Sequence, residues 1–124
     1  MIIETLIKMV FDNIQSKHEE LQEMGLSCMR GLVEKFGERI VNQSLDIFES
    51  YLEQSTDLHQ TSGINRVILN MSKAASHRLL HQIKPRLVAF ADPFLISDDD
   101  KIRELSAKVF LTIWRRLGDP VYTQ

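Results

Sequence analysis

Three consecutive aspartates, Asp98, Asp99 and Asp100, form the densest group of possible metal ligands in the sequence. A calcium loop needs spaced carboxylates, a central glycine and a distal glutamate. The segment DDDKIRELSAKV has adjacent carboxylates and no glycine. An aspartate that precedes a helix can instead accept hydrogen bonds from the free N–H groups of the first turn and interact favourably with the helix dipole. The sequence therefore predicts a helix cap at this position.

Two histidines, His77 and His81, are four residues apart and would share one face of a helix, where they could bind zinc. The metalloprotease pattern also needs a glutamate directly after the first histidine, and this chain has Arg78 there. No further cysteine or histidine lies nearby in the sequence to complete a site. The pattern favours a solvated histidine pair near a helix junction.

The single cysteine, Cys28, falls on an apolar helix face, so we expect a small buried hydrophobic residue rather than a nucleophile. One cysteine allows no internal disulfide, which fits a reducing, cytoplasmic setting. Neither a glycine-rich phosphate loop nor a G-x-S-x-G elbow occurs. We therefore expect no enzymatic activity, no cofactor and no small-molecule substrate.

The composition indicates one helical domain. The chain has 124 residues, 44% of them hydrophobic, and a formal net charge of -2, which predicts no gross attraction to nucleic acid or membrane. Its apolar runs are too short to span a bilayer, and the first residues carry Glu4 and lack the basic lead of a signal peptide. Five glycines and three prolines offer little turn chemistry for a many-stranded fold, so the expected class is all-α.

Apolar residues recur at helical spacing along most of the chain. We expect Gly37 to end a helix, Pro85 to lie in the first turn of another, and Pro93 to end or kink that helix. Residues 55–62 form a polar break. Trp114 is expected to pack within the last pair of helices, or to form its exposed edge if a fourth repeat is missing. The apolar stripes occupy residues 4–15, 17–36, 40–52, 64–71, 87–90 and 102–117.

These runs form three copies of one unit. Gly37, Ser76 and Gly118 align at offsets of 39 and 42 residues. The aligned columns are Cys28, Val67 and Val109; Met29, Ile68 and Phe110; Leu32, Met71 and Ile113; and Ile40, Leu79 and Val121. A helix-pair period near 40 residues predicts an α-solenoid of the HEAT or armadillo type, a single domain (1–124) with repeats at about 1–37, 38–76 and 77–118. Terminal repeats expose apolar faces, so self-association is expected.

The solvent face of the second helix in each pair changes in charge along the chain. Ser27, Arg66 and Lys108 form one ladder, and Glu34, Lys73 and Arg115 form another. Lys101 and Arg116 add to the basic end. Two interpretations remain open: a solvated face that keeps the protein soluble, or a strip that docks an acidic protein or ribosomal RNA phosphate.

Three segments carry a resemblance to one family. GLVEKFGERI (Gly31–Ile40), SGINRVILNMSKAASHRLL from Ser62 and DDDKIRELSAKVF from Asp98 resemble successive HEAT units of the general-control translational activator family. In the last segment, Asp100, Ile102 and Arg103 resemble the turn of a HEAT repeat. The resemblance extends over most of the chain.

The resemblance implies a non-catalytic scaffold, here a fragment of a much longer array. Members of the family bind ribosomes and the amino-terminal domain of the initiation-factor kinase that responds to amino-acid starvation. The family supplies no catalytic residue to transfer. Elongation-factor-three-like, importin-like and phosphatase-scaffold-like arrays share the pattern, so a ribosome- or RNA-contacting module of such a protein is the alternative.

Overall fold

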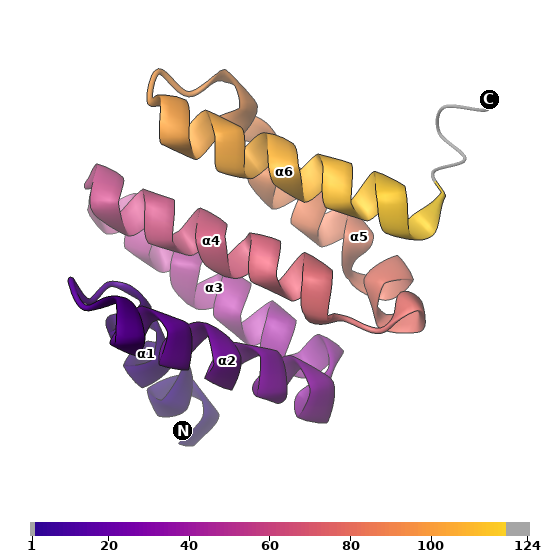
Figure 1. The fold of residues 1–124 in the computed structure, drawn as a ribbon, viewed down its shortest axis with the longest axis horizontal. Coiled ribbons are helices and arrows are strands. Elements are labelled where there is room, and N and C mark those ends of the chain that lie inside the picture. The colour runs from indigo at the N-terminus through magenta and orange to yellow at the C-terminus, as the bar shows by residue number, and fades with distance from the viewer. Residues whose placement is uncertain (1, 119–124) are drawn as a thin grey trace.

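The protein is all-helical over residues 2–118, the part of the chain that the computed structural model describes (Figure 1). No strand occurs in this part, and none of its helices combines the length and apolar character needed to cross a bilayer. The elements are α1 (Ile2–Ile14), α2 (Glu19–Phe36), α3 (Glu38–Gln54), α4 (Leu58–Ala74), α5 (His77–Ala91), the 3-10 helix η1 (Asp92–Ile96) and α6 (Asp100–Leu117).

The helices pack in two rows. Helix α4 contacts α2 on one side and α6 on the other, and α3 in the same way contacts α1 and α5. Figure 1 shows α2, α4 and α6 side by side, with α3 and α5 behind them. Contacts between consecutive helices, α1 with α2, α3 with α4 and α5 with α6, join the two rows.

The hydrophobic core runs between the rows and includes residues of all six α-helices. Three of the aligned columns are buried or packed against this core: Met29, Ile68 and Phe110; Leu32, Met71 and Ile113; and the first two members of the column Ile40, Leu79 and Val121. Val121 lies outside the described residues. The alignment thus identifies most of the core on the second helices.

An aromatic cluster joins α1 to α3. The ring centroid of Phe11 lies 5.1 Å from that of Phe48 and 5.7 Å from that of Tyr51. Burial raises the pKa of the Tyr51 hydroxyl, and the carboxylates of Asp12 and Glu4 raise it further. The hydroxyl is therefore protonated and uncharged at neutral pH. The Tyr51 ring packs in the aromatic cluster without a charge to solvate.

Side-chain caps set the starts of α4, α5 and α6. Asp99 accepts a hydrogen bond from the Ile102 N–H at 3.0 Å, which confirms the predicted aspartate cap. Asp57 accepts one from the His59 N–H, so α4 begins at Leu58 and the polar break predicted for 55–62 is wrong beyond Asp57. The prediction for Gly37 is confirmed, since its φ of 61° is one that residues with a Cβ rarely adopt.

Pro85 does not begin a helix, contrary to the sequence prediction. Helix α5 starts at His77, where the Ser76 hydroxyl accepts a hydrogen bond from the Leu79 N–H at 3.1 Å, and Pro85 lies inside it. The serine cap fixes the helix start at His77, so Pro85 lies in the helix interior, where it has no N–H to donate to the His81 carbonyl. Pro93 follows the end of α5 and opens η1, as predicted.

Two residues on predicted apolar helix faces are exposed. Cys28 is exposed although its aligned partners Val67 and Val109 are fully buried, so its predicted burial is wrong. Trp114 is 45% exposed and therefore lies at an edge of the third pair, the second of the two placements expected for it.

We expect Asp99→Ala to lower the free energy of unfolding by about 1 kcal/mol, the usual cost of losing a helix cap. Asp98→Ala is the matched control, because Asp98 is exposed, and its substitution should change stability by less than about 0.5 kcal/mol. Urea denaturation of the three proteins measures the difference. Equal stability of the two variants would contradict the capping role.

We expect Trp114→Ala to cost less than about 3 kcal/mol, because a half-exposed ring loses little burial. Phe48→Ala, at a fully buried position, should cost about 3–5 kcal/mol. Denaturant melts of both variants test this order. A larger loss for Trp114→Ala than for Phe48→Ala would show that the tryptophan supports the core.

Candidate functional site

The aspartate cluster is a structural element of the α6 start. Asp99 caps the helix, and Asp100 forms an ion pair with Arg103 one turn later. The Arg103 guanidinium also donates to the Ser97 carbonyl at 2.7 Å, which ties the turn to the helix. Within residues 2–118, no three histidine, cysteine or acidic side chains come together in an arrangement that could hold a metal ion.

The histidine pair is accessible to solvent but provides only two possible metal ligands. His77 and His81 are both exposed in the first turns of α5, with ring centroids 4.8 Å apart in an edge-to-face arrangement. They share a helix face, as their spacing predicted. Two imidazoles provide half of the four ligands of a typical structural zinc site.

The basic strip predicted from the sequence divides into exposed and bonded residues. Lys73 on α4, and Lys101, Lys108 and Arg115 on α6, are exposed. Lys108 pairs with Glu104 at 3.1 Å, an exposed contact within one helix that contributes little to stability. These four cations lie on two adjacent helices of one row, where an acidic partner could reach them.

Arg66, the fifth member of the strip, is half-buried at the junction of α2 and α4. Its guanidinium donates to the Gln22 side-chain oxygen at 3.3 Å. With Lys73 and Asn70 it borders a shallow depression of about 150 Å³, whose apolar walls come from three helices of the row. Those walls are formed by Leu26, Leu69 and Leu105.

Arg116, the sixth member, is half-buried and bonded within the fold. Its guanidinium donates to the Ser72 carbonyl at 2.9 Å and to the Ala75 carbonyl at 2.6 Å. These oxygens belong to the last turn of α4 and its cap, where carbonyl groups have no partner within the helix. A cation there also meets the negative end of the helix dipole. Arg116 therefore fixes α6 to the end of α4.

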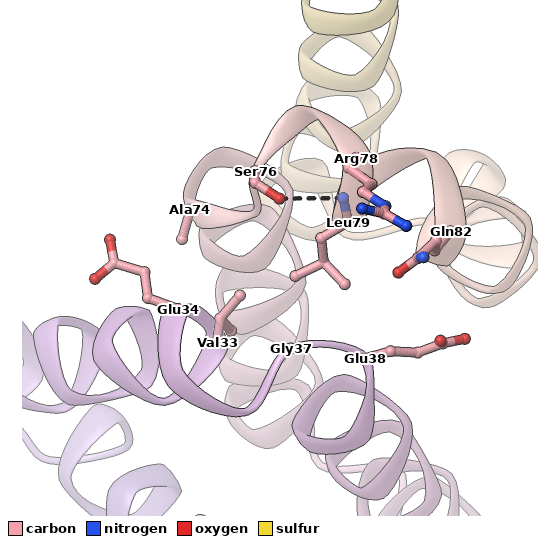
Figure 2. Close-up of a pocket in the computed structure, with 9 residues that line it drawn as sticks. All are labelled: Val33, Glu34, Gly37, Glu38, Ala74, Ser76, Arg78, Leu79 and Gln82. Carbon is pink, nitrogen blue, oxygen red and sulfur yellow. Dashed lines mark hydrogen bonds between the residues drawn. The ribbon is translucent and has the colours of Figure 1, made fainter.

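A larger depression, of about 440 Å³, lies between the α2–α3 turn and the α4–α5 turn (Figure 2). The side chains of Val33 and Leu79 form its apolar part, and Glu34 and Arg78 lie on opposite sides. The Ser76 hydroxyl in its wall is already engaged with the Leu79 N–H, as the dashed line shows. The lining offers one arginine, two glutamates and no histidine or cysteine, so it suits contact with a polar partner better than covalent chemistry.

Sequence reasoning missed the side-chain contacts that join the helix pairs. Asn70 donates to the Leu26 carbonyl at 3.0 Å, and Arg86 on α5 donates to Asn42, Asp46 and Glu49 on α3. Four of the hydrogen bonds between pairs join residues that are 44 positions apart: Arg66 to Gln22, Asn70 to Leu26, Arg86 to Asn42 and Arg116 to Ser72. No local pattern in the sequence marks these contacts, because each joins residues about 40 positions apart.

Comparison with known proteins adds no relative. No protein-family model, no curated protein and no solved structure matches the chain.

We expect Arg116→Ala to lower the free energy of unfolding by about 1.5–3 kcal/mol, the usual worth of hydrogen bonds that involve a charged group. Arg115→Ala, the neighbouring and exposed arginine, is the matched control and should stay within about 0.5 kcal/mol of the parent. Chemical denaturation compares the two. If both substitutions cost the same, the helix-end contact of Arg116 does not stabilise the fold.

Proposed function

We propose that the chain is an α-solenoid of three HEAT-like helix pairs. Three observations support this architecture. The second helices contact in chain order, α2 with α4 and α4 with α6, and the first helices do the same. Successive pairs are joined by hydrogen bonds, four of which link residues 44 apart. Columns 39 and 42 residues apart share core positions.

We propose further that this array is a non-catalytic scaffold for protein–protein interaction and acts in the cytoplasm. By resemblance it is part of a translational activator that links ribosomes to the amino-terminal domain of an initiation-factor kinase during amino-acid starvation. Three polar side chains considered above serve the fold: Asp99 and Ser76 cap helices, and Arg116 bonds helix-end carbonyls. Such a scaffold needs an accessible, specific surface and no reaction centre.

One observation carries the proposal: Lys73, Lys108 and Arg115 are exposed on adjacent helices of one row. Lys73 also borders the depression lined by Leu26, Leu69 and Leu105. An apolar depression rimmed by cations matches a protein segment that presents an apolar side chain beside carboxylates. The partner is therefore an acidic protein surface, with the kinase domain as the candidate.

The alternative function is contact with ribosomal RNA through the same cations. The exposed charges alone would suffice for phosphate contact, whereas the apolar depression would then be unused. Salt dependence separates the two, because phosphate contacts weaken steeply with salt and an interface with an apolar centre does so much less.

We expect Lys73→Glu with Arg115→Glu to weaken binding to purified ribosomes or to the kinase domain. Because both residues are exposed, the free energy of unfolding should change by less than about 0.5 kcal/mol. Co-sedimentation with ribosomes, and titration of the kinase domain, each at two salt concentrations, measure the effect. Loss of a steep salt dependence in the ribosome assay would favour the RNA alternative.

The matched control is Lys17→Glu with Arg39→Glu, which changes the net charge equally at two exposed positions outside α4 and α6. This control should bind like the parent protein. If both double variants lose binding to the same extent, net charge and not the basic strip controls the interaction. If neither loses binding, the partner surface lies elsewhere.

A further inference from the structure

Helix α2 exposes the side that α4 and α6 use to contact the preceding helix. With the offset of 39 residues, Asn70 and Val67 on α4 correspond to Gly31 and Cys28 on α2. Asn70 bonds to α2 and Val67 is fully buried, yet Gly31 and Cys28 are exposed. Met24, one turn before Cys28, is 57% exposed. We call Met24, Cys28 and Gly31 the leading edge.

Helix α6 exposes the opposite side, the one that α2 and α4 use to contact the following helix. With offsets of 39 and 42 residues, Leu26 and Asn65 correspond to Ala107, and Leu69 corresponds to Leu111. Asn65 and Leu69 are buried, whereas Ala107 is exposed and Leu111 is 37% exposed. We call Ala107 and Leu111 the trailing edge. Both edges are apolar, and each corresponds to one half of an interface that the fold already contains.

The two edges lie on helices of opposite charge. Helix α2 carries four glutamates against one arginine and one lysine, whereas α6 carries five basic residues against one aspartate and one glutamate. Contact between two α2 helices would bring like charges together, and so would contact between two α6 helices. Contact between α6 of one copy and α2 of another brings opposite charges together, which favours this pairing over the two symmetric ones.

We propose that a second copy of this chain docks head to tail, with its leading edge on the trailing edge of the first copy. The contact would continue the row formed by α2, α4 and α6 into the next molecule. Small residues, Gly31 on one edge and Ala107 on the other, allow close approach of the two helices. The inference depends on the equivalence of the three helix pairs and not on the ribosome or the kinase.

The test uses one substitution on each edge. Met24→Glu blocks the leading edge and Leu111→Glu blocks the trailing edge, both at exposed positions where glutamate does not enter the core. Sedimentation velocity over a range of concentrations should show association of the parent protein and monomers for each variant alone. An equal mixture of the two variants should form a dimer, because each contributes the edge that the other lacks. Circular dichroism and thermal melting verify that both variants are folded.

Three outcomes would overturn the proposal. The first is a parent protein that remains monomeric at every concentration. The second is a single variant that still dimerises alone, which would indicate a symmetric contact through its intact edge. The third is a mixture that stays monomeric although the parent associates, which would place the interface elsewhere.

The single thiol provides a second readout of the same contact. Cys28 is exposed in the leading edge, so its reaction with a thiol reagent should slow as the parent protein associates. The reaction should not slow with concentration in the Met24→Glu variant. In the mixture, only the Leu111→Glu protein should show protection of Cys28. Equal reaction rates at all concentrations of the associating parent would contradict the assignment of Cys28 to the interface.

Discussion

The rest of the structure depends on the packing of α4 between α2 and α6. Nearly all of α4 from Thr61 to Ser72 is buried, polar residues included. Two of its buried side chains donate within the helix: Asn65 to the Thr61 carbonyl and Ser72 to the Leu69 carbonyl. Gly63 leaves the space that the side chain of Gln15 fills, since a Cβ there would lie 2.2 Å from the Gln15 nitrogen. A larger residue there would require the flexible end of the Gln15 side chain to move.

Hydrogen bonds between neighbouring pairs add direction to this packing. The hydrophobic effect that drives the apolar contacts is itself non-directional. Asn70 and Arg116 each bond to a backbone carbonyl of the neighbouring pair, and a carbonyl has a fixed position on its helix. Arg86 adds a similar tie between α3 and α5, with two carboxylates within 4 Å of its guanidinium. These bonds restrict the register between pairs. Two of the donors are arginines, which charge alone would place on the surface.

Periodicity and cap chemistry predict much of this fold, because both act within one helix. The aspartate cap at Asp99 and the positive φ of Gly37 follow from the free N–H groups and the steric limits of any helix end. The sequence pattern does not predict which side of each helix packs against a neighbouring helix. Cys28 and Val67 occupy the same column, yet only the valine has a helix packed over it; Arg115 and Arg116 are adjacent, yet only Arg116 reaches the end of α4. Such differences arise from contacts between residues more than 40 positions apart along the chain. A local sequence pattern does not predict which of these contacts form.

The two proposed interactions of α6 are not independent. Arg115 of the basic strip lies one helical turn after Leu111 of the trailing edge, so the two side chains are neighbours on the helix surface. A partner that covers Arg115 therefore also covers part of the edge that would receive a second copy. Lys73 lies on α4, so it is not one helical turn from either residue of the trailing edge. Binding of an acidic partner at the basic strip and head-to-tail contact would then compete at Arg115 and Leu111, so that the partner, once bound, favours the monomer by mass action.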